Sequence, residues 1–469
     1  LQSRGVARGD RVATFLENSV EAVISIYAAL KCGAVFMPVN PLTKQDKLAY
    51  LLNDSRASAL ITHSALQSEF TGALAQNTSV HTCLVAGDAA ALNEAPRCLP
   101  LPDCAQMDAS AALSDPGLID QDLGGIIYTS GSTGDAKGVM LTHLNMVSAA
   151  RSISTYLGLK HDDVIFCALP LAFDYGLYQI LMGFKKEATV VLERSFTFPV
   201  KALGVMQAHS VTVFPGVPTM FSMLMNLKTL RDYALPSLRS ITNTAAALSE
   251  EHIRQLRDLF PQAQLFSMYG LTECKRVTYL PPDQLDVRPT SVGRGMPNEE
   301  VWLVDESGKR LPNGSTGELV IRGSNVMRGY WEKPAQTRER LKPGPIPGEM
   351  ILFSGDIFRT DDEGYLYFVA RKDDIIKSRG EKVSPREVEN VLYSMPAVLE
   401  AAVVGTPDAV LGESIKAFVS LKSGFSASEK DIIGYCASKL ESFMVPKHVV
   451  IMDSLPKTDT GKIKKTGLR

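Results

Sequence analysis

The sequence has few cysteines, and their positions exclude several classes of protein. Seven of the 469 residues are cysteines, and only Cys98 and Cys104 lie close together. None of the seven shows paired metal-ligand spacing, and an odd, scattered set in a chain of this length argues against a disulfide framework. We therefore expect a protein of a reducing, cytoplasmic compartment.

Excess charge and long apolar runs are absent as well. The chain has 49 Lys and Arg against 51 Asp and Glu, a net charge of -2, so its composition gives no general attraction to nucleic acid or to an anionic membrane. No run of about 18 uncharged apolar residues occurs, so we expect no integral membrane segment. The chain opens on "LQSRGVARGDRV", without an initiator Met or a signal-peptide core, and we expect residues to be missing before it.

The pattern of the sequence changes twice along its length. Helix-like and strand-like segments alternate at first: "SVEAVISIYAALKCG" predicts a helix that ends at Gly33, and "AVFMPV" and "VTVFPG" predict strands. Such alternation is typical of parallel sheets covered by helices on both faces. From about residue 291, strands and turns such as "PNGS" predict a small antiparallel, β-barrel-like subdomain.

A second change falls near residues 371–374, after which a small α+β unit is expected. Its first helix is predicted to begin with Ser384 as N-cap and Pro385 as first residue. We therefore predict an α/β protein with an N-terminal domain of parallel-rich α/β sheets, residues 1–372, in which the β-rich subdomain covers about 291–370. A C-terminal domain, residues 373–469, follows.

The stretch "YTSGSTGDAKGV", residues 128–139, follows an apolar strand and contains three glycines, five hydroxyl side chains and one lysine. It is neither a G-x-x-x-x-G-K-[ST] loop nor a G-x-G-x-x-G fingerprint. Free backbone N–H groups, hydroxyls and the compact charge of Lys137 suit a polyphosphate. The alternative is a flexible surface linker.

These residues resemble the phosphate loop of the adenylate-forming (ANL) superfamily, which includes acyl-CoA synthetases, nonribosomal-peptide adenylation domains, aryl-acid ligases and luciferases. One departure is Ala136, where the family usually has Pro. Four further stretches resemble family motifs in order: "KCGAVFMPVNP" (31–41), "MYGLTE" (268–273), "SGDIFRTDDEGYLYFVARKDDIIKSRGEKVSPREVE" (354–389) and "LPKTDTGKIKK" (455–465). The resemblance covers essentially the whole chain.

The resemblance implies a reaction and a set of roles. A carboxylic acid and ATP would give an acyl-adenylate and pyrophosphate, and a thiol would then displace AMP. ATP and Mg²⁺ are the expected cofactors, with CoA or phosphopantetheine as the thiol acceptor. Lys462, Thr272 and Glu273 would be catalytic, with Glu273 also on the metal. Nucleotide binding is expected at Thr129, Ser130, Gly131, Ser132, Thr133, Gly134, Lys137, Tyr269, Gly270, Asp356 and Arg371.

The chemistry of the first step agrees with these residue types. A carboxylic acid of pKa about 4 is already ionised at neutral pH, so the first step needs no general base. Its difficulty is to bring one anion against another, which calls for charge neutralisation and alignment. The resemblance further implies that the C-terminal domain is mobile and rotates about a hinge at Asp373, so that Gly380 faces the thiol.

The segment "LPLAFDYGLYQIL" (169–181) is where the resemblance places the acyl group, together with Ala245 and Ala246 of "TNTAAAL". Phe173-Asp174 resembles the "FD" pair of enzymes whose Asp binds a substrate amino group. An ionised Asp in an apolar pocket needs a partner. That partner is either a substrate ammonium or an internal cation, Lys275 or Arg276.

Three readings of function stay open from the sequence. The first is an AMP-forming ligase that delivers its acyl group to CoA, and the second is an adenylation enzyme that loads a carrier protein. The third is a degenerate, non-catalytic binding protein, which intact Lys137, Glu273, Asp356, Arg371 and Lys462 argue against. His143 is expected to be a helix-surface or core histidine rather than a group that approaches substrate or thiol. Cys274 is expected to be a small packed thiol rather than a nucleophile.

Overall fold

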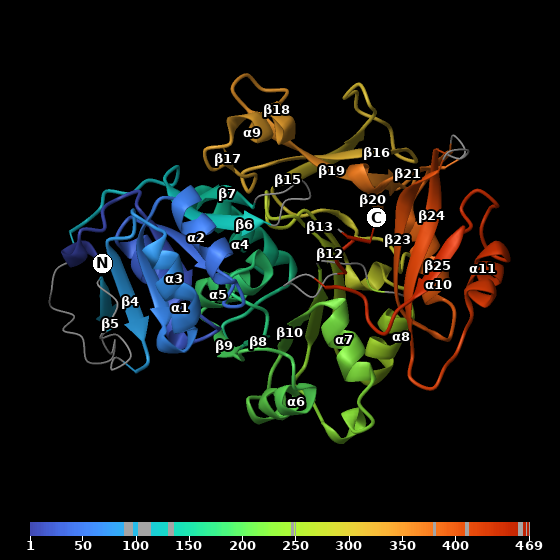
Figure 1. Ribbon diagram of the computed structural model, residues 1–469, viewed down its shortest axis with the longest axis horizontal. Helices are drawn as coiled ribbons and strands as arrows, with labels where there is room; N and C mark the ends of the chain where they lie inside the picture. The colour runs from blue at the N-terminus through green and yellow to red at the C-terminus, as the bar shows by residue number, and fades with distance from the viewer. Residues whose placement is uncertain are drawn as a thin grey trace.

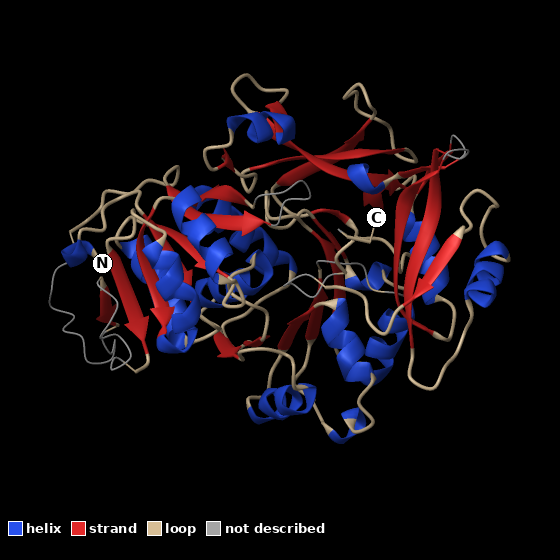
Figure 2. Ribbon diagram, viewed as in Figure 1, coloured by secondary structure: helices blue, strands red, loops and turns tan. Residues whose placement is uncertain are grey.

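The computed structural model describes residues 1–88, 97–101, 114–129, 136–244, 248, 250–378, 381–408, 412–457, 463–465 and 467–468. Within this part of the chain the strands form four sheets, and helices flank them (Figures 1 and 2). No helix of the described residues is long and apolar enough to cross a membrane.

The first sheet has the strand order β17-β7-β6-β2-β1-β3-β4-β5. Strands β1 to β6 pair in parallel, whereas β7 pairs antiparallel with both β6 and β17. The bounds are β1 Arg11–Phe15, β2 Val35–Val39, β3 Ala57–His63, β4 Thr82–Ala86, β5 Cys98–Pro100, β6 Leu123–Thr129, β7 Lys137–Thr142 and β17 Gly329–Tyr330.

The second sheet has the order β14-β13-β12-β11-β10-β8-β9, parallel from β9 to β12 and antiparallel beyond. Its strands are β8 Val164–Cys167, β9 Thr189–Leu192, β10 Val213–Gly216, β11 Ser240–Asn243, β12 Gln264–Tyr269, β13 Thr278–Leu280 and β14 Arg294–Gly295. The predicted parallel-rich sheets are therefore present, each with an antiparallel edge.

Helices cover both faces of the two sheets, as the alternation predicted. One core lies between the sheets and combines Val12 of β1 and Ile165 of β8 with Ile26, Ile153 and Ile180 of helices α1, α4 and α5. Helices α2 and α3 pack on the other face of the first sheet, and α6, α7 and α8 on that of the second. The bounds are α1 Val20–Lys31, α2 Gln45–Asp54, α3 Gln67–Ala75, α4 His143–Tyr156, α5 Asp174–Lys185, α6 Pro199–Ala208, α7 Pro218–Met225 and α8 Glu250–Leu259.

Helix α1 shows why these boundaries can be read from the sequence. The Ser19 side chain accepts a hydrogen bond from the Ala22 backbone N–H at the first turn. At the other end Gly33 has φ 76°, and its N–H donates to the Leu30 carbonyl while Ala34 N–H donates to Ala29. This C-terminal motif needs a residue in the left-handed region, which glycine adopts without strain.

The third sheet, with the order β15-β16-β19-β18 and β20 paired to β19, is antiparallel throughout. Its strands are β15 Glu299–Val304, β16 Thr316–Gly323, β18 Leu341–Pro343, β19 Met350–Thr360 and β20 Leu366–Arg371, and helix α9 Pro334–Arg340 lies beside it. The antiparallel strand pairing predicted from the turn residues is confirmed.

The fourth sheet follows the third in the chain, with the order β22-β21-β24-β23 and β25 paired to β24 (red in Figure 1). Its elements are β21 Ile376–Ser378, β22 Glu381–Val383, α10 Pro385–Tyr393, β23 Val398–Asp408, β24 Gly412–Leu421, α11 Glu429–Ala437 and β25 His448–Ile451. Val388, Val403 and Ile432 share a separate core. Helix α10 begins after Ser384 with Pro385 at its first position, as predicted.

Candidate active site

Strands β6 and β7 form a hairpin that carries both ends of the glycine-rich loop. Thr129 and Lys137 are register partners in this hairpin, and the Thr129 hydroxyl donates to the Lys137 carbonyl at 3.5 Å. A Cβ at Gly138 would lie 2.7 Å from the Ile126 side chain, so this position requires glycine. Ser130, Gly131, Ser132, Thr133 and Gly134 lie outside the described residues.

The two-residue strand β17 brings the magnesium-motif residue next to the phosphate-loop lysine. The Tyr330 hydroxyl donates to Glu273 Oε1 at 2.7 Å, and Lys137 Nζ lies 5.6 Å from the centre of the Tyr330 ring. The Met327 N–H also donates to the Glu273 carbonyl at 2.7 Å. Burial and the nearby carboxylate raise the pKa of Tyr330, which keeps its hydroxyl a donor.

Tyr330 is a site residue that the sequence analysis missed. Its strand pairs with β7 through Gly329 opposite Met140 and Tyr330 opposite Val139. Two residues are too few to show a strand period, so hydrophobic patterning carries no signal here. The aromatic pair after glycine in "RGYW" was the available clue.

A second group of predicted residues meets at the end of β12. The Tyr269 hydroxyl donates to Asp356 Oδ2 at 2.6 Å, and Arg371 stands opposite Asp356 in the register of β19 and β20. Burial raises the pKa of Asp356, although the Tyr269 hydrogen bond and the Arg371 charge oppose that shift. The structure thus brings together three of the predicted nucleotide-binding residues from three strands.

The loop between β12 and β13 holds Thr272 and Glu273 in a tight turn. Val277 N–H donates to the Tyr269 carbonyl at 3.0 Å and closes this loop. A Cβ at Gly270 would lie 2.5 Å from the Lys275 carbonyl oxygen, and Lys275 itself has φ 68°. Gly270 is therefore required by close backbone approach.

At the predicted acyl site, Phe173 is the N-cap residue of α5 and Asp174 is its first residue. Lys275 Nζ lies 3.3 Å from Asp174 Oδ2, and the Lys275 side chain is 2% exposed. Lys275 is one of the two internal cations that the sequence named as a partner for Asp174. Burial lowers the pKa of Lys275 to about 7, with Asp174 opposing the shift.

Several predicted residues lie outside the described part of the chain: Ala245, Ala246, Gly380 and Lys462. On either side of residues 458–462, Lys457 and Ile463 form an isolated antiparallel bridge. Asp373 belongs to a short 3-10 helix, Lys372–Asp374, but its side chain is not among those described.

Cys274 is packed, as expected, whereas His143 is half-buried. Cys274 is buried, and burial raises the pKa of its thiol. Burial lowers the pKa of His143, the first residue of α4. Among the described residues, no three His, Cys, Asp or Glu side chains form a metal-binding group.

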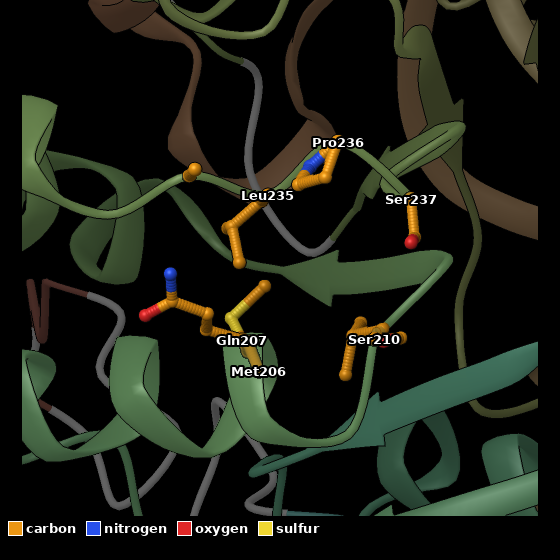
Figure 3. Close-up of a pocket in the computed structure, with 8 residues that line it drawn as sticks. Met206, Gln207, Ser210, Leu235, Pro236 and Ser237 are labelled. Atoms are coloured by element: carbon orange, nitrogen blue, oxygen red, sulfur yellow. The ribbon is translucent and has the colours of Figure 1, made fainter.

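A cavity of about 200 Å³ lies away from these residues, between the C-terminal end of α6 and the segment before β11 (Figure 3). Met206, Gln207, Ser210 and Leu235 line it. None of the predicted site residues does, so we do not assign the chemistry to it.

Two family models match the chain: "AMP-binding enzyme" over residues 1–331 and "AMP-binding enzyme C-terminal domain" over residues 387–462. A long-chain-fatty-acid–CoA ligase of Bacillus subtilis (strain 168) is 32% identical, over 99% of this chain and 86% of that protein. A feruloyl-CoA synthase of Amycolatopsis sp is 34% identical, over 100% of this chain and 90% of that protein.

Among solved structures, ATP-bound MatB from Rhodopseudomonas palustris matches with a TM-score of 0.86 and 29% identity, covering 100% of this chain and 90% of that one. Apo MatB, at the same identity and coverage, matches with a TM-score of 0.76. The arrangement of this chain is therefore more similar to the ATP-bound form than to the apo form.

Proposed function

Because the chain belongs to the AMP-binding enzyme family, within the adenylate-forming superfamily, we propose that it joins a carboxylic acid to the α-phosphate of ATP and then to the thiol of CoA. In the first step the carboxylate oxygen attacks the α-phosphorus and pyrophosphate leaves. In the second step the thiolate attacks the acyl carbon and AMP leaves. Its relatives named as CoA ligases support CoA as the acceptor.

The observation that carries this proposal is the contact of Tyr330 with both Lys137 and Glu273. The first step brings a carboxylate against a polyanion, so it needs a cation near the outer phosphates and a metal near the reacting one. Tyr330 lies against Lys137 through its ring and against Glu273 through its hydroxyl. One side chain thereby contacts both groups.

The donor chemistry of Glu273 fits Mg²⁺. A hard cation prefers carboxylate oxygen and phosphate ligands, and Glu273 offers Oε2 beside the Oε1 that accepts from Tyr330. The ion would supply charge neutralisation at the phosphates. The residues of this chain would hold the nucleotide, with Asp356 accepting ribose hydroxyls and Tyr269 beside the base.

The C-terminal domain would provide the remaining groups. We propose Lys462 as the cation that reaches both the α-phosphate and the attacking carboxylate, Asp373 as the hinge, and Gly380 as the residue that faces the thiol after rotation. The match with the ATP-bound neighbour supports assigning the arrangement of this structure to the nucleotide-binding stage.

The acid need not carry an amino group. Lys275 already donates a hydrogen bond to Asp174, so a substrate ammonium is not required to stabilise that carboxylate. Phe173 and Asp174 would then shape the acyl site rather than bind a substrate amino group.

ATP–pyrophosphate exchange over a panel of amino, aryl, aliphatic and dicarboxylic acids tests the first step. Incubation of the active acids with ATP and CoA alone tests the second: a CoA thioester and AMP are expected. Enzyme-bound adenylate without thioester would instead indicate a carrier protein as the acceptor. No exchange with any acid would contradict the proposal.

Tyr330→Phe tests the contact of Tyr330 with Lys137 and Glu273. The substitution removes the hydrogen bond to Glu273 and keeps the ring against Lys137. Loss of a hydrogen bond to a charged group lowers a rate about tenfold or more. We expect adenylation to fall about tenfold while nucleotide binding persists. Tyr367→Phe is the control, because its hydroxyl also contacts a carboxylate, Asp361, at 3.1 Å in the antiparallel sheet. Equal effects in both variants would contradict the role of Tyr330.

A further inference from the structure

Arg276 is a buried cation without a counter-ion in the described structure. Its side chain is among the largest fully buried ones, at 1% exposure, and its Nε has no hydrogen-bond partner. Among the described residues, no carboxylate lies within ion-pairing distance of its guanidinium. An unpaired charge removed from water is strongly unfavourable, which is why buried charges are normally paired.

Glu273 is the carboxylate nearest to Arg276 in the sequence, and it accepts from the Tyr330 hydroxyl. Two further carboxylates, Asp174 and Glu299, have partners of their own. Asp174 pairs with Lys275 at 3.3 Å. Glu299 accepts from Asn325 Nδ2 at 2.6 Å, and burial raises the pKa of its carboxyl, which favours the neutral form. Neither group supplies the negative charge that Arg276 lacks.

The guanidinium lies against α5, the helix that begins at the proposed acyl-site residue Asp174. It is 5.0 Å from the centre of the Tyr175 ring, and Tyr175 directly follows Asp174 on α5. The Tyr175 hydroxyl contacts Thr242 on β11. The aromatic face offsets only part of the cost of a buried charge.

We propose that Arg276 binds a second carboxylate of the acid, remote from the one that is activated, and that the enzyme therefore prefers dicarboxylic acids. This inference rests on the function proposed above and names the substrate class of the same site. A carboxylate and a guanidinium pair through two parallel N–H···O bonds, which gives orientation as well as affinity.

The test compares matched acids in ATP–pyrophosphate exchange with the full-length protein. The pairs are butanedioate and butanoate, hexanedioate and hexanoate, decanedioate and decanoate, and benzene-1,4-dicarboxylate and benzoate. In the best pair we expect kcat/KM of the diacid to exceed that of the monoacid by about tenfold to a hundredfold, the range for a charged hydrogen-bonded pair.

Two substitutions at Arg276 and one at a control arginine test whether Arg276 causes the preference for the diacid. Arg276→Gln is expected to remove the preference for the diacid, and Arg276→Lys to retain part of it. Arg359→Gln is the matched control, because Arg359 lies 4.5 Å from the Tyr367 ring on an exposed face of the antiparallel sheet. It should leave the preference unchanged. Calorimetric titration of the best diacid into the wild type and Arg276→Gln gives a readout independent of turnover.

The outcomes separate the two proposals. Exchange with monoacids at rates equal to or above those of every diacid overturns this inference and leaves the proposed function in place. Equal losses for mono- and diacids in Arg276→Gln also overturn it, since Arg276 would then act on the activated carboxylate or on folding. No exchange with any acid contradicts the proposed function, and calorimetry without diacid binding then overturns the inference separately.

Discussion

The buried side chain of Lys275 affects both the local charge at the proposed acyl site and the pH dependence of stability. It is 2% exposed, lies 4.6 Å from the Tyr178 ring, and pairs with Asp174. Burial, together with the charge of Arg276, lowers its pKa to about 7 against the attraction of Asp174. The folded protein thus favours the neutral amine far more than the unfolded chain does.

We predict that Lys275 makes the free energy of unfolding depend on pH and that Lys275→Met removes this dependence. Between pH 7 and about 10.5 the unfolded chain binds the proton and the folded one does not, so stability rises with pH. The slope from this group is up to about 1.4 kcal/mol per pH unit. Denaturant unfolding of the wild type and Lys275→Met at pH 7, 8 and 9 measures this slope. The stability of the variant relative to the wild type should be greatest at pH 7.

Lys342→Met is the control for that slope. Lys342 also lies over an aromatic ring, 4.0 Å from the centre of Phe353, but it is exposed. Its replacement should leave the dependence on pH unchanged. A Lys275→Met protein with the slope of the wild type would show that the amine titrates normally.

The sequence named candidate site residues but not the contacts between them. Phosphate chemistry pointed to Lys137, whereas Glu273 and Asp356 came from the family resemblance, and their roles stay predictions. The sequence left the partner of Asp174 open, because Lys275 lies 101 residues away and only the fold brings the two together. Tyr330 was missed for the same reason.

At the scale of elements, the segment that contains β17 anchors the strand of the phosphate loop. Lys333 Nζ lies 2.7 Å from Asp54 Oδ1 at the end of α2, and the Trp331 indole N–H donates to the Asp54 carbonyl at 3.1 Å. The Trp331 backbone N–H donates to the Gly138 carbonyl at 2.7 Å. Helix α2 is thereby tied through this segment to β7, on which Lys137 lies.

We predict that Lys333→Met weakens this anchor. Both partners of the ion pair are less than one-fifth exposed, so breaking it should cost about 1–3 kcal/mol of stability, between the values for surface and buried pairs. Because Tyr50 bridges Asp54 and the carbonyl of Ala136, KM for ATP should rise more than KM for the acid. Thermal unfolding and exchange kinetics give the two measurements.

An exposed ion pair provides the comparison for that variant. Lys44 lies 3.3 Å from Glu69 and is 83% exposed, so Lys44→Met should change neither quantity measurably. If Lys333→Met lowered stability with no selective change in KM for ATP, the anchor would be purely structural.

Elements with a clear period were predicted well, and short or irregular ones were not. Helix α1 and strands β2 and β10 follow from caps and apolar runs, since local signals determine them. The antiparallel return of β17 to the first sheet depends on contacts across nearly 200 residues. The Ser384 side chain likewise donates to the Val369 carbonyl at 2.6 Å instead of capping α10.

For the whole molecule, the Ser384 hydrogen bond spans the predicted hinge. Val369 is on β20, before Asp373, and Ser384 begins α10 after it. Rotation about Asp373 would separate the two residues, so this bond favours the observed arrangement. That arrangement is more similar to the ATP-bound neighbour than to the apo one.

Ser384→Ala should therefore shift the balance between the two half-reactions. A neutral hydrogen bond contributes about 0.5–1.5 kcal/mol, or about twofold to tenfold in a population. We expect adenylation, measured by pyrophosphate exchange, to slow by that factor relative to thioester formation from preformed adenylate. Helix α10 should be unaffected, because the Ser384 side chain makes no capping bond to it. Ser394→Ala is the control, since its hydroxyl donates to Val391 within the same helix region. A fall of both half-reactions together in Ser384→Ala would mean that the bond stabilises the fold without biasing the rotation.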